Sequence, residues 1–428
     1  MLGALAWIAA LALAACGDDP GTDAGAGADA GVGADAGADM DAAAATDAGA
    51  DAGAETDAEI AADAGPLDAG PYCLDGVGLA RPVPVCSTAE PCTELLASYA
   101  LLDPPVDRIE TASDRPVCGT TSVGTGRGQP MFDDGAPSTW TDPDGVDRFW
   151  CEHRPAGTSS TSPRPVVIWV PPSGSTADGL YDTTSLRSKA PTYDLSGDPT
   201  RPGFILVSIQ PRNLRWPTAD PQQGTKSDSF FRDLGAPSTN PDIALLDHVV
   251  DALVSEGVAD PARIFVSGWS NGARMSGLYG IARHGTPTPG GNQIAAVANY
   301  SGGDPFAPPT FADEACRGVP YPTSTVPFLL VSRTCDEIAC NAAADDMAVP
   351  GNVVEPWVTA LRDQIGADVT WVRIDDDGVE RAACAIAGLC GPTRALLNHV
   401  RWPDGVGDRS GNDLEPRMLD FLRDHPLP

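Results

Sequence analysis

The chain has 428 residues, of which 42% are hydrophobic, and its formal net charge at pH 7 is −32. This composition allows a sizeable folded core, but the acidity argues against nucleic acid as a partner, because binding to phosphates requires a basic surface. Eleven cysteines favour a protein that functions outside the cytoplasm.

The first 16 residues are typical of a lipoprotein signal peptide. Residues 2–15 are apolar, too few to span a bilayer, and end in Leu13-Ala14-Ala15-Cys16. No Lys or Arg precedes Arg81, so the amine of Met1 is the only positive charge near this stretch. We expect Cys16 to be lipidated and the membrane to be reached only through that lipid. The expected location is the cell envelope, at the outer membrane or cell surface, or secretion into the medium.

Residues 17–70 repeat Asp-Ala-Gly and contain 14 acidic residues, with no basic or aromatic residue. Low hydrophobicity and like-charge repulsion predict a disordered, extended tether. Calcium binding is the alternative, but the Gly-rich nonapeptide pattern of calcium-binding repeats is absent.

Without Cys16, ten cysteines remain, which predicts a framework of up to five disulfides. Five lie in the first part of the folded region and five in the second, so full pairing requires at least one bridge between the two parts. Such a bridge would clamp residues 71–150, which include the Cys- and Pro-rich extension at 71–144, onto the rest of a catalytic domain that spans 145–428. A zinc site is disfavoured because no pair has zinc-ligand spacing. The two groups are Cys73, Cys86, Cys92, Cys118 and Cys151, and Cys316, Cys335, Cys340, Cys384 and Cys390.

From about residue 145, segments typical of strands alternate with segments typical of helices. One helix should begin at Pro241 with Asn240 as its N-cap, and an amphipathic closing helix should include residues 418–422. This order predicts a mostly parallel sheet with helices on both faces, the α/β-hydrolase fold, preceded by a disulfide-rich extension. The expected strands are 148–151, 165–170, 203–209, 263–267, 294–300, 327–332 and 369–374.

The pentapeptide Gly268-Trp269-Ser270-Asn271-Gly272 follows an apolar strand and precedes an apolar helical face. Residues 260–263 predict a turn into that strand. This context is typical of a nucleophile elbow, in which a serine occupies a strained strand-to-helix turn. Gly268 and Gly272 would allow the strand and helix to approach closely. Ser270 is therefore the candidate nucleophile.

A serine nucleophile needs a base and an acid that orients it. His399 is the one histidine of five between the last expected strand and the closing helix, although a surface histidine is the simpler alternative. Asp336 follows the strand at 327–332 and gives the chain order Ser, Asp, His. Asp304, after the preceding strand, is the competing acid. Disulfides between Cys335 and Cys340 and between Cys384 and Cys390 could brace the loops that carry the acid and precede the base.

The oxyanion of a tetrahedral intermediate needs two backbone donors. Asn271, directly after the serine, should supply one. The other should come from residues 171–175, where Gly174 permits close approach and Ser175 is the expected donor, since Pro171 and Pro172 have no N–H.

The segment from Val258 to Gly272 resembles secreted esterases of the polyhydroxybutyrate-depolymerase and feruloyl-esterase types, similar to carbohydrate esterase family 1. The same resemblance extends to residues 295–303 and to His399, which lies three residues before Trp402-Pro403. In all, it covers about residues 145–425. Such enzymes usually have His-Gly where this chain has Ser173-Gly174, and His-Gly-x-x-Asp where it has residues 332–336. The first difference alters the wall of the site.

These observations predict an extracytoplasmic serine esterase that needs no metal or cofactor. Its substrate would be a small or polymeric ester, with a polyester or the feruloyl or acetyl esters of polysaccharide as candidates. A serine peptidase of the same fold is an alternative, because triad chemistry does not distinguish an ester from an amide. A non-catalytic binding protein is the third possibility. The sequence leaves the acyl specificity and the oligomeric state open.

Overall fold

A computed structural model shows part of the chain in detail. The predicted signal with Cys16, the tether, most of the extension and every cysteine except Cys118 and Cys151 lie outside the described residues. The described residues are 116–120, 131–143, 145–212, 227, 236–305, 324–333, 336, 354–374, 399–406 and 413–428.

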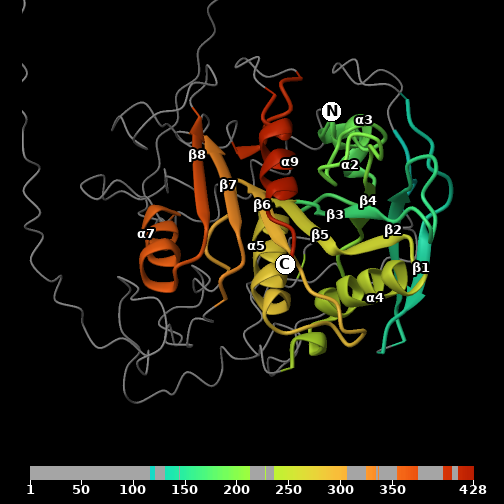
Figure 1. Cartoon of the computed structure of the whole chain (residues 1–428), viewed down its shortest axis with the longest axis horizontal. Helices are drawn as coiled ribbons and strands as arrows, with labels where there is room; N and C mark the ends of the chain where they lie inside the picture. The colour runs from blue at the N-terminus through green and yellow to red at the C-terminus, as the bar shows by residue number, and fades with distance from the viewer. Residues whose placement is uncertain are drawn as a thin grey trace, which may run out of the picture. The chain divides into compact units, whose positions relative to one another are not determined.

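An eight-stranded sheet forms the centre of this part of the chain (Figure 1). Its strand order is β1-β2-β4-β3-β5-β6-β7-β8. β2 pairs antiparallel with both β1 and β4, and all the remaining neighbours are parallel. This topology is that of the α/β-hydrolase fold, which confirms the predicted fold class. The strands are β1 (Ser138–Thr141), β2 (Asp147–His153), β3 (Arg164–Val170), β4 (Ile205–Ile209), β5 (Ala259–Trp269), β6 (Ala296–Tyr300), β7 (Phe328–Arg333) and β8 (Val369–Ile374).

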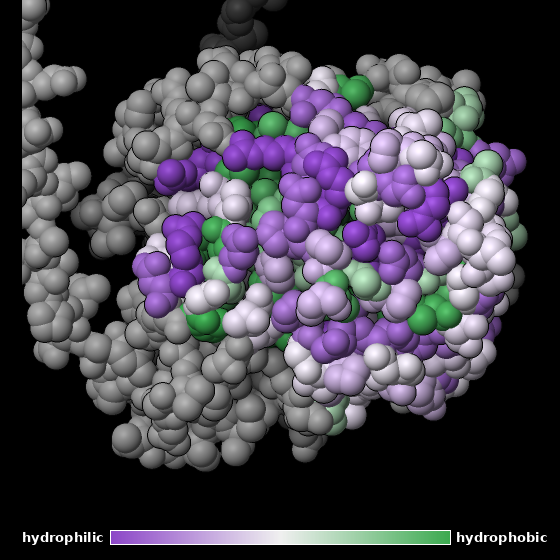
Figure 2. Space-filling view, in the orientation of Figure 1, coloured by the Kyte–Doolittle hydropathy of each residue, from purple (hydrophilic) through white to green (hydrophobic). Residues whose placement is uncertain are grey.

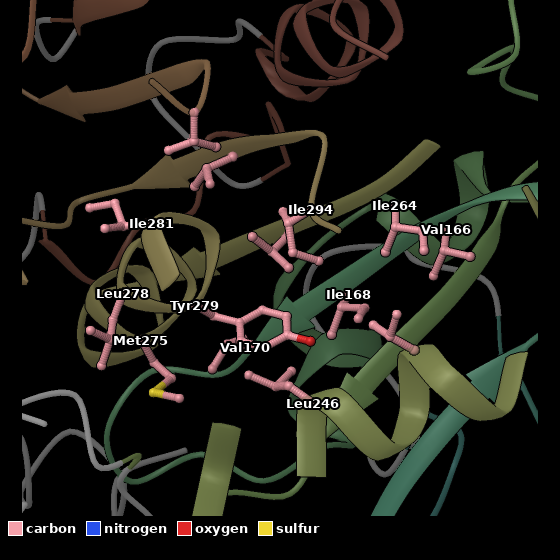
Figure 3. Packing of buried hydrophobic residues seen from close by; sticks show 14 of the residues in the cluster. Val166, Ile168, Val170, Leu246, Ile264, Met275, Leu278, Tyr279, Ile281 and Ile294 are labelled. Carbon is pink, nitrogen blue, oxygen red and sulfur yellow. The ribbon is translucent and has the colours of Figure 1, made fainter. Parts of the chain in front are cut away.

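Side chains alternate along each buried strand, so the sheet presents apolar side chains on both of its faces. Helices cover both faces and bury them. On β3, Val166, Ile168 and Val170 face α4 and α5, as Figure 3 shows, and residues of α7 belong to the same apolar cluster. Val167 and Trp169 point to the opposite face, toward α2, α3 and α9. The helices are α2 (Gly179–Thr183), α3 (Leu186–Lys189), α4 (Pro241–Ser255), α5 (Asn271–His284), α7 (Val354–Ala360) and α9 (Glu415–Asp424), with a 3₁₀ helix at Pro237–Thr239 and a π-helical turn at Leu361–Ile365.

The start of α4 is as predicted. Asn240 is the N-cap, and its side chain accepts hydrogen bonds from the amides of Asp242 at 2.8 Å and Ile243 at 3.0 Å. β5 begins at Ala259, before the predicted start at 263, but residues 260–263 still form a local turn within it, where the Ala262 amide donates to the Asp260 side chain at 3.0 Å. The pairing of β5 with β3 shifts register in this part, where Pro261 has no N–H to donate to the ladder.

Part of the N-terminal extension is fastened to the sheet. A disulfide joins Cys118 to Cys151 of β2. Arg187 of α3 forms an ion pair with Asp134 at 2.6 Å, and the hydroxyl of Tyr181 donates to the same carboxylate at 2.9 Å. The cysteines of the other predicted disulfides, including the bridge that full pairing requires between the two groups, lie outside the described residues.

Polar side chains cover most of the described surface on the face shown in Figure 2, and apolar residues appear there as small separate patches. Within the described residues, no helix has the length and apolar character needed to cross a membrane.

Candidate active site

Ser270 lies at a sharp junction between β5 and α5. Its backbone has φ 56° and ψ −119°, a conformation that non-glycine residues rarely adopt. A Cβ on Gly268 would lie 2.3 Å from the carbonyl oxygen of Gly272, and a Cβ on Gly272 would lie 2.1 Å from that of Val170. Only glycine fits at either position, so the start of α5 is brought against the end of β3.

The imidazole of His399 lies between Ser270 and Asp336. Its Nε2 is 2.8 Å from Ser270 Oγ, and its Nδ1 is 3.2 Å from Asp336 Oδ1. Ser270 and Asp336 follow the carboxyl ends of the parallel strands β5 and β7. The sheet therefore brings together three side chains that are far apart in the sequence.

Burial increases from the serine to the aspartate. Ser270 is partly exposed, His399 is 7% exposed, and Asp336 is completely buried. A substrate can therefore approach the hydroxyl while the carboxylate stays away from solvent. The competing acid, Asp304, lies just after β6, where its backbone carbonyl accepts a hydrogen bond from Arg274 at 3.1 Å.

Ser301, which was not among the predicted site residues, also contacts the histidine. It directly follows β6, has φ 51°, and places its Oγ 2.5 Å from Nδ1 of His399. Ser301 is completely buried. Its position at the end of a central parallel strand was the only sequence signal that could have drawn attention to it.

Indole groups hold the segment that carries His399. The Nε1–H of Trp269, the residue before the serine, donates to the backbone carbonyl of His399 at 2.8 Å. Trp402 packs against Trp269, Tyr300 and Trp169, with ring centroids 5.7 to 6.3 Å apart. The nucleophile strand and the histidine segment are thus joined by both a hydrogen bond and ring packing.

Glu415, the first residue of α9, accepts a hydrogen bond from the indole of Trp402. Its carboxylate accepts from Trp402 Nε1 at 2.6 Å and from the Ser185 amide at 2.8 Å, and it pairs with Lys189 at 2.7 Å. Burial raises the pKa of Glu415 to about 7, despite the Lys189 ammonium beside it. This group therefore changes charge close to neutral pH.

The two predicted oxyanion donors differ in their surroundings. Asn271 is the first residue of α5, so its amide lies at the positive end of the helix dipole, beside Ser270. The amide of Ser175 instead donates to the carbonyl of Pro172 at 3.1 Å, in a turn where Gly174 has φ 76°. In this conformation the turn uses the N–H that the sequence assigned to the oxyanion, and the role of Ser175 stays a prediction.

The side chain of Asn271 has a contact that the sequence did not predict. Its Oδ1 accepts from the backbone amide of Ser227 at 2.8 Å, and its Nδ2 donates to the Ser227 carbonyl at 3.3 Å. This pair of bonds fixes residue 227 beside the nucleophile.

The other four histidines have different partners. His153 contacts Asp134 at 3.2 Å, and His284 contacts the carbonyl of Ile294 at 2.8 Å. His425 lies 2.9 Å from Asp368. His248 stacks on a tryptophan ring, and burial lowers its pKa. In the described part of the chain, no group of three or more acidic, histidine or cysteine side chains is arranged to hold a metal.

No protein-family model matches the chain, and no curated protein sequence matches it significantly. Solved structures are similar at a low level. A thermostable esterase is 16% identical with a TM-score of 0.39, over 68% of this chain and 63% of its own. An ester hydrolase from the metagenome of Lake Arreo is 15% identical with a TM-score of 0.37, over 69% and 84%. An esterase of the Planctomycetes species Thermogutta terrifontis is 12% identical with a TM-score of 0.37, over 62% and 91%.

The class of the protein follows from its own strand order. The central parallel strand β5 leads through a strained serine into α5, and the sheet lies between two layers of helices. The chain has the α/β-hydrolase fold.

Proposed function

We propose that this protein is a serine hydrolase that cleaves carboxylic esters. The observation that carries the proposal is the hydroxyl of Ser270, partly exposed, 2.8 Å from a histidine nitrogen whose ring also contacts a buried carboxylate. A hydroxyl is a weak nucleophile, and an adjacent imidazole activates it by accepting its proton.

In the proposed reaction, Ser270 Oγ attacks the ester carbonyl carbon while its proton passes to His399 Nε2. The oxyanion formed lies near the amide of Asn271, where the helix dipole stabilises negative charge. His399 then returns the proton to the leaving alcohol oxygen, which leaves an acyl-enzyme on Ser270. A water molecule then attacks the acyl carbon while its proton passes to His399 Nε2. The bond between the acyl carbon and Ser270 Oγ breaks, His399 returns the proton to Oγ, and the carboxylic acid leaves. Asp336 stabilises the imidazolium that forms in each step.

The resemblance found in the sequence supports a narrower substrate class: polyesters, or feruloyl or acetyl esters of polysaccharide. An extracytoplasmic location is part of the same proposal. It is supported by the signal-like sequence that ends at Cys16 and by the disulfide between Cys118 and Cys151, since such bonds persist in oxidising compartments.

The test is the turnover of p-nitrophenyl acetate by the purified protein, together with labelling by a fluorophosphonate probe. Ser270→Ala should abolish labelling and lower kcat by about 10⁴-fold or more, because the members of such a site act as a unit. Ser255→Ala, at an exposed position at the end of α4, is the matched control and should behave like the wild type.

Equal activity of Ser270→Ala and the wild type would contradict the proposal. Turnover of a peptide anilide in preference to the ester would indicate a peptidase. A wild-type protein that neither turns over esters nor reacts with the probe would be a binding protein with a hydrolase fold.

A further inference from the structure

Two non-glycine residues have a positive φ among the described residues, and both are serines that touch His399. Ser270, with φ 56°, lies at Nε2, and Ser301, with φ 51°, lies at Nδ1. A strained backbone persists only where the surrounding structure holds it, and such residues cluster at functional sites. The strain at Ser270 is explained by the elbow, but that at Ser301 is not.

We propose that Ser301 is a positioning residue that, together with Asp336, keeps the proton of His399 on Nδ1 and leaves Nε2 free to accept the proton of Ser270. This inference rests on the proposed function, because it concerns the base of the same reaction. It adds a fourth side chain to the set that the sequence identified.

The hydrogen-bonding capacities of the three groups decide the direction of the Ser301 bond. An ionised carboxylate can only accept hydrogen bonds, so the Asp336 oxygen at 3.2 Å requires the proton to be on Nδ1. Ser301 Oγ, 2.5 Å from the same nitrogen, then accepts from that N–H as well. If Ser301 instead donated to Nδ1, the ring proton would be on Nε2, and the histidine could not act as a base.

The backbone around Ser301 fixes its side chain in this position. Its amide donates to the carbonyl of Val331 on β7 at 2.8 Å. The next residue, Gly302, lies so close to α5 that a Cβ there would be 2.6 Å from the Cβ of Ala273. The chain therefore turns tightly between β7 and α5, and the turn directs the hydroxyl at the histidine.

The expected consequence is a stronger base. An acceptor on Nδ1 stabilises the imidazolium more than the neutral ring, so it raises the pKa of the histidine and favours proton transfer from Ser270. Removing the hydroxyl should therefore weaken the base and shift its titration to lower pH. A residue that serves only to pack the core would not produce this shift.

The experiment compares Ser301→Ala and Ser301→Gly with the wild type in the full-length protein. Both variants lack the hydroxyl, but glycine adopts a positive φ without strain, so it folds even where alanine is not tolerated. The rate of fluorophosphonate labelling and kcat/KM for p-nitrophenyl acetate are measured between pH 5 and 9. In both variants the labelling rate and kcat/KM should fall by about tenfold, the effect of losing a hydrogen bond to a charged group. The midpoint of the rise in kcat/KM on the acid side of the pH profile should move to lower pH.

Ser208→Ala is the matched control. Ser208 is a completely buried serine of β4 whose hydroxyl donates to the Ala177 carbonyl at 2.6 Å, away from His399. It should keep the wild-type rate and pH midpoint. Wild-type rates for the Ser301 variants, or a loss of rate without a shift of the midpoint, would overturn the inference. A wild-type protein that neither hydrolyses the ester nor reacts with the probe would instead refute the proposed function.

Discussion

Asp336 and His399 are almost completely removed from solvent, whereas Ser270 can be reached from it. In such surroundings the interaction between the carboxylate and an imidazolium is screened less than it would be in water. In the reaction proposed above, the carboxylate would therefore stabilise the imidazolium without contacting the substrate.

This arrangement predicts that the identity of the acid can be tested by one pair of substitutions. Asp336→Asn should leave the fold intact and lower kcat by about 10³- to 10⁴-fold, because an amide can hold the wrong tautomer of the histidine. Asp304→Asn is the matched control and should stay within a few-fold of the wild type. Steady-state kinetics of both purified variants on p-nitrophenyl acetate give the comparison. A larger loss of kcat in Asp304→Asn than in Asp336→Asn would transfer the acid role to Asp304.

For single residues, the sequence predicted a place in the site when the residue lies next to a recognisable strand or helix. Ser270, Asp336 and His399 were identified because each follows a recognisable strand or precedes a recognisable helix. Ser301 was missed, since its contact with His399 depends on the direction of a single side chain within a turn. Such directions are set by local backbone geometry, which residue types alone do not encode.

The helix α9 carries no residue of the site but is linked to it through Trp402. Glu415 at its first turn binds the indole of Trp402, and Trp402 packs against the residue that precedes the nucleophile. The helix is therefore coupled to the histidine segment through one buried carboxylate.

The pKa of Glu415 gives this coupling a pH dependence. Its folded-state pKa of about 7 lies above the ordinary 4.5, so the folded protein binds the proton more tightly than the unfolded chain does. The contribution of protonated Glu415 to the free energy of unfolding is complete below about pH 4.5 and is lost as pH rises through 7. For a fully buried group this contribution is on the order of 3 kcal/mol.

Glu415→Gln should remove this part of the pH dependence, because the amide does not titrate but still offers an oxygen to Trp402. The free energy of unfolding by urea, measured from pH 4.5 to 8, should fall less steeply for this variant than for the wild type. Glu256→Gln serves as control: Glu256 is exposed, and its hydrogen bond from Arg154 lowers its pKa, out of this range. Identical slopes for Glu415→Gln and the wild type would contradict the prediction.

Elements differ in how well the sequence predicted them. The buried parallel strands and α4 were recognised, because continuous apolar runs, helical periodicity and a capping asparagine are local signals. β1, α2, α3 and α7 were not predicted, since they have only 4, 5, 4 and 7 residues, too few to show a period. The start of β5 was misplaced because Pro261 suggested a turn, whereas the sheet accommodates it with a register shift.

On the scale of the whole molecule, a disulfide joins the described part of the extension covalently to β2, the second strand of the sheet. Cys118 and Cys151 are both 1% exposed and are separated by 33 residues in the sequence. The bond closes a long loop and thereby restricts the unfolded chain more than the folded one.

Replacing both cysteines, Cys118→Ala with Cys151→Ala, should lower the free energy of unfolding by about 4 kcal/mol, the chain-entropy estimate for a loop of this length. Activity at low temperature should be retained, because neither residue contacts the site. Urea unfolding and ester turnover of the same preparation test both parts. A stability within about 1 kcal/mol of the wild type would show that the bridge adds little.

The residues that meet around His399 are distant along the chain, and this determines when the site can form. Ser270 and His399 are 129 positions apart, and Ser185 and Glu415 are 230 apart. Contacts of such separation carry a large loop-closure cost and tend to form late in folding. During synthesis, Ser270 emerges well before its base, so the nascent chain carries a serine that nothing activates. We therefore expect the contact between Ser270 and His399, on which the proposed activation of the serine depends, to form late in folding.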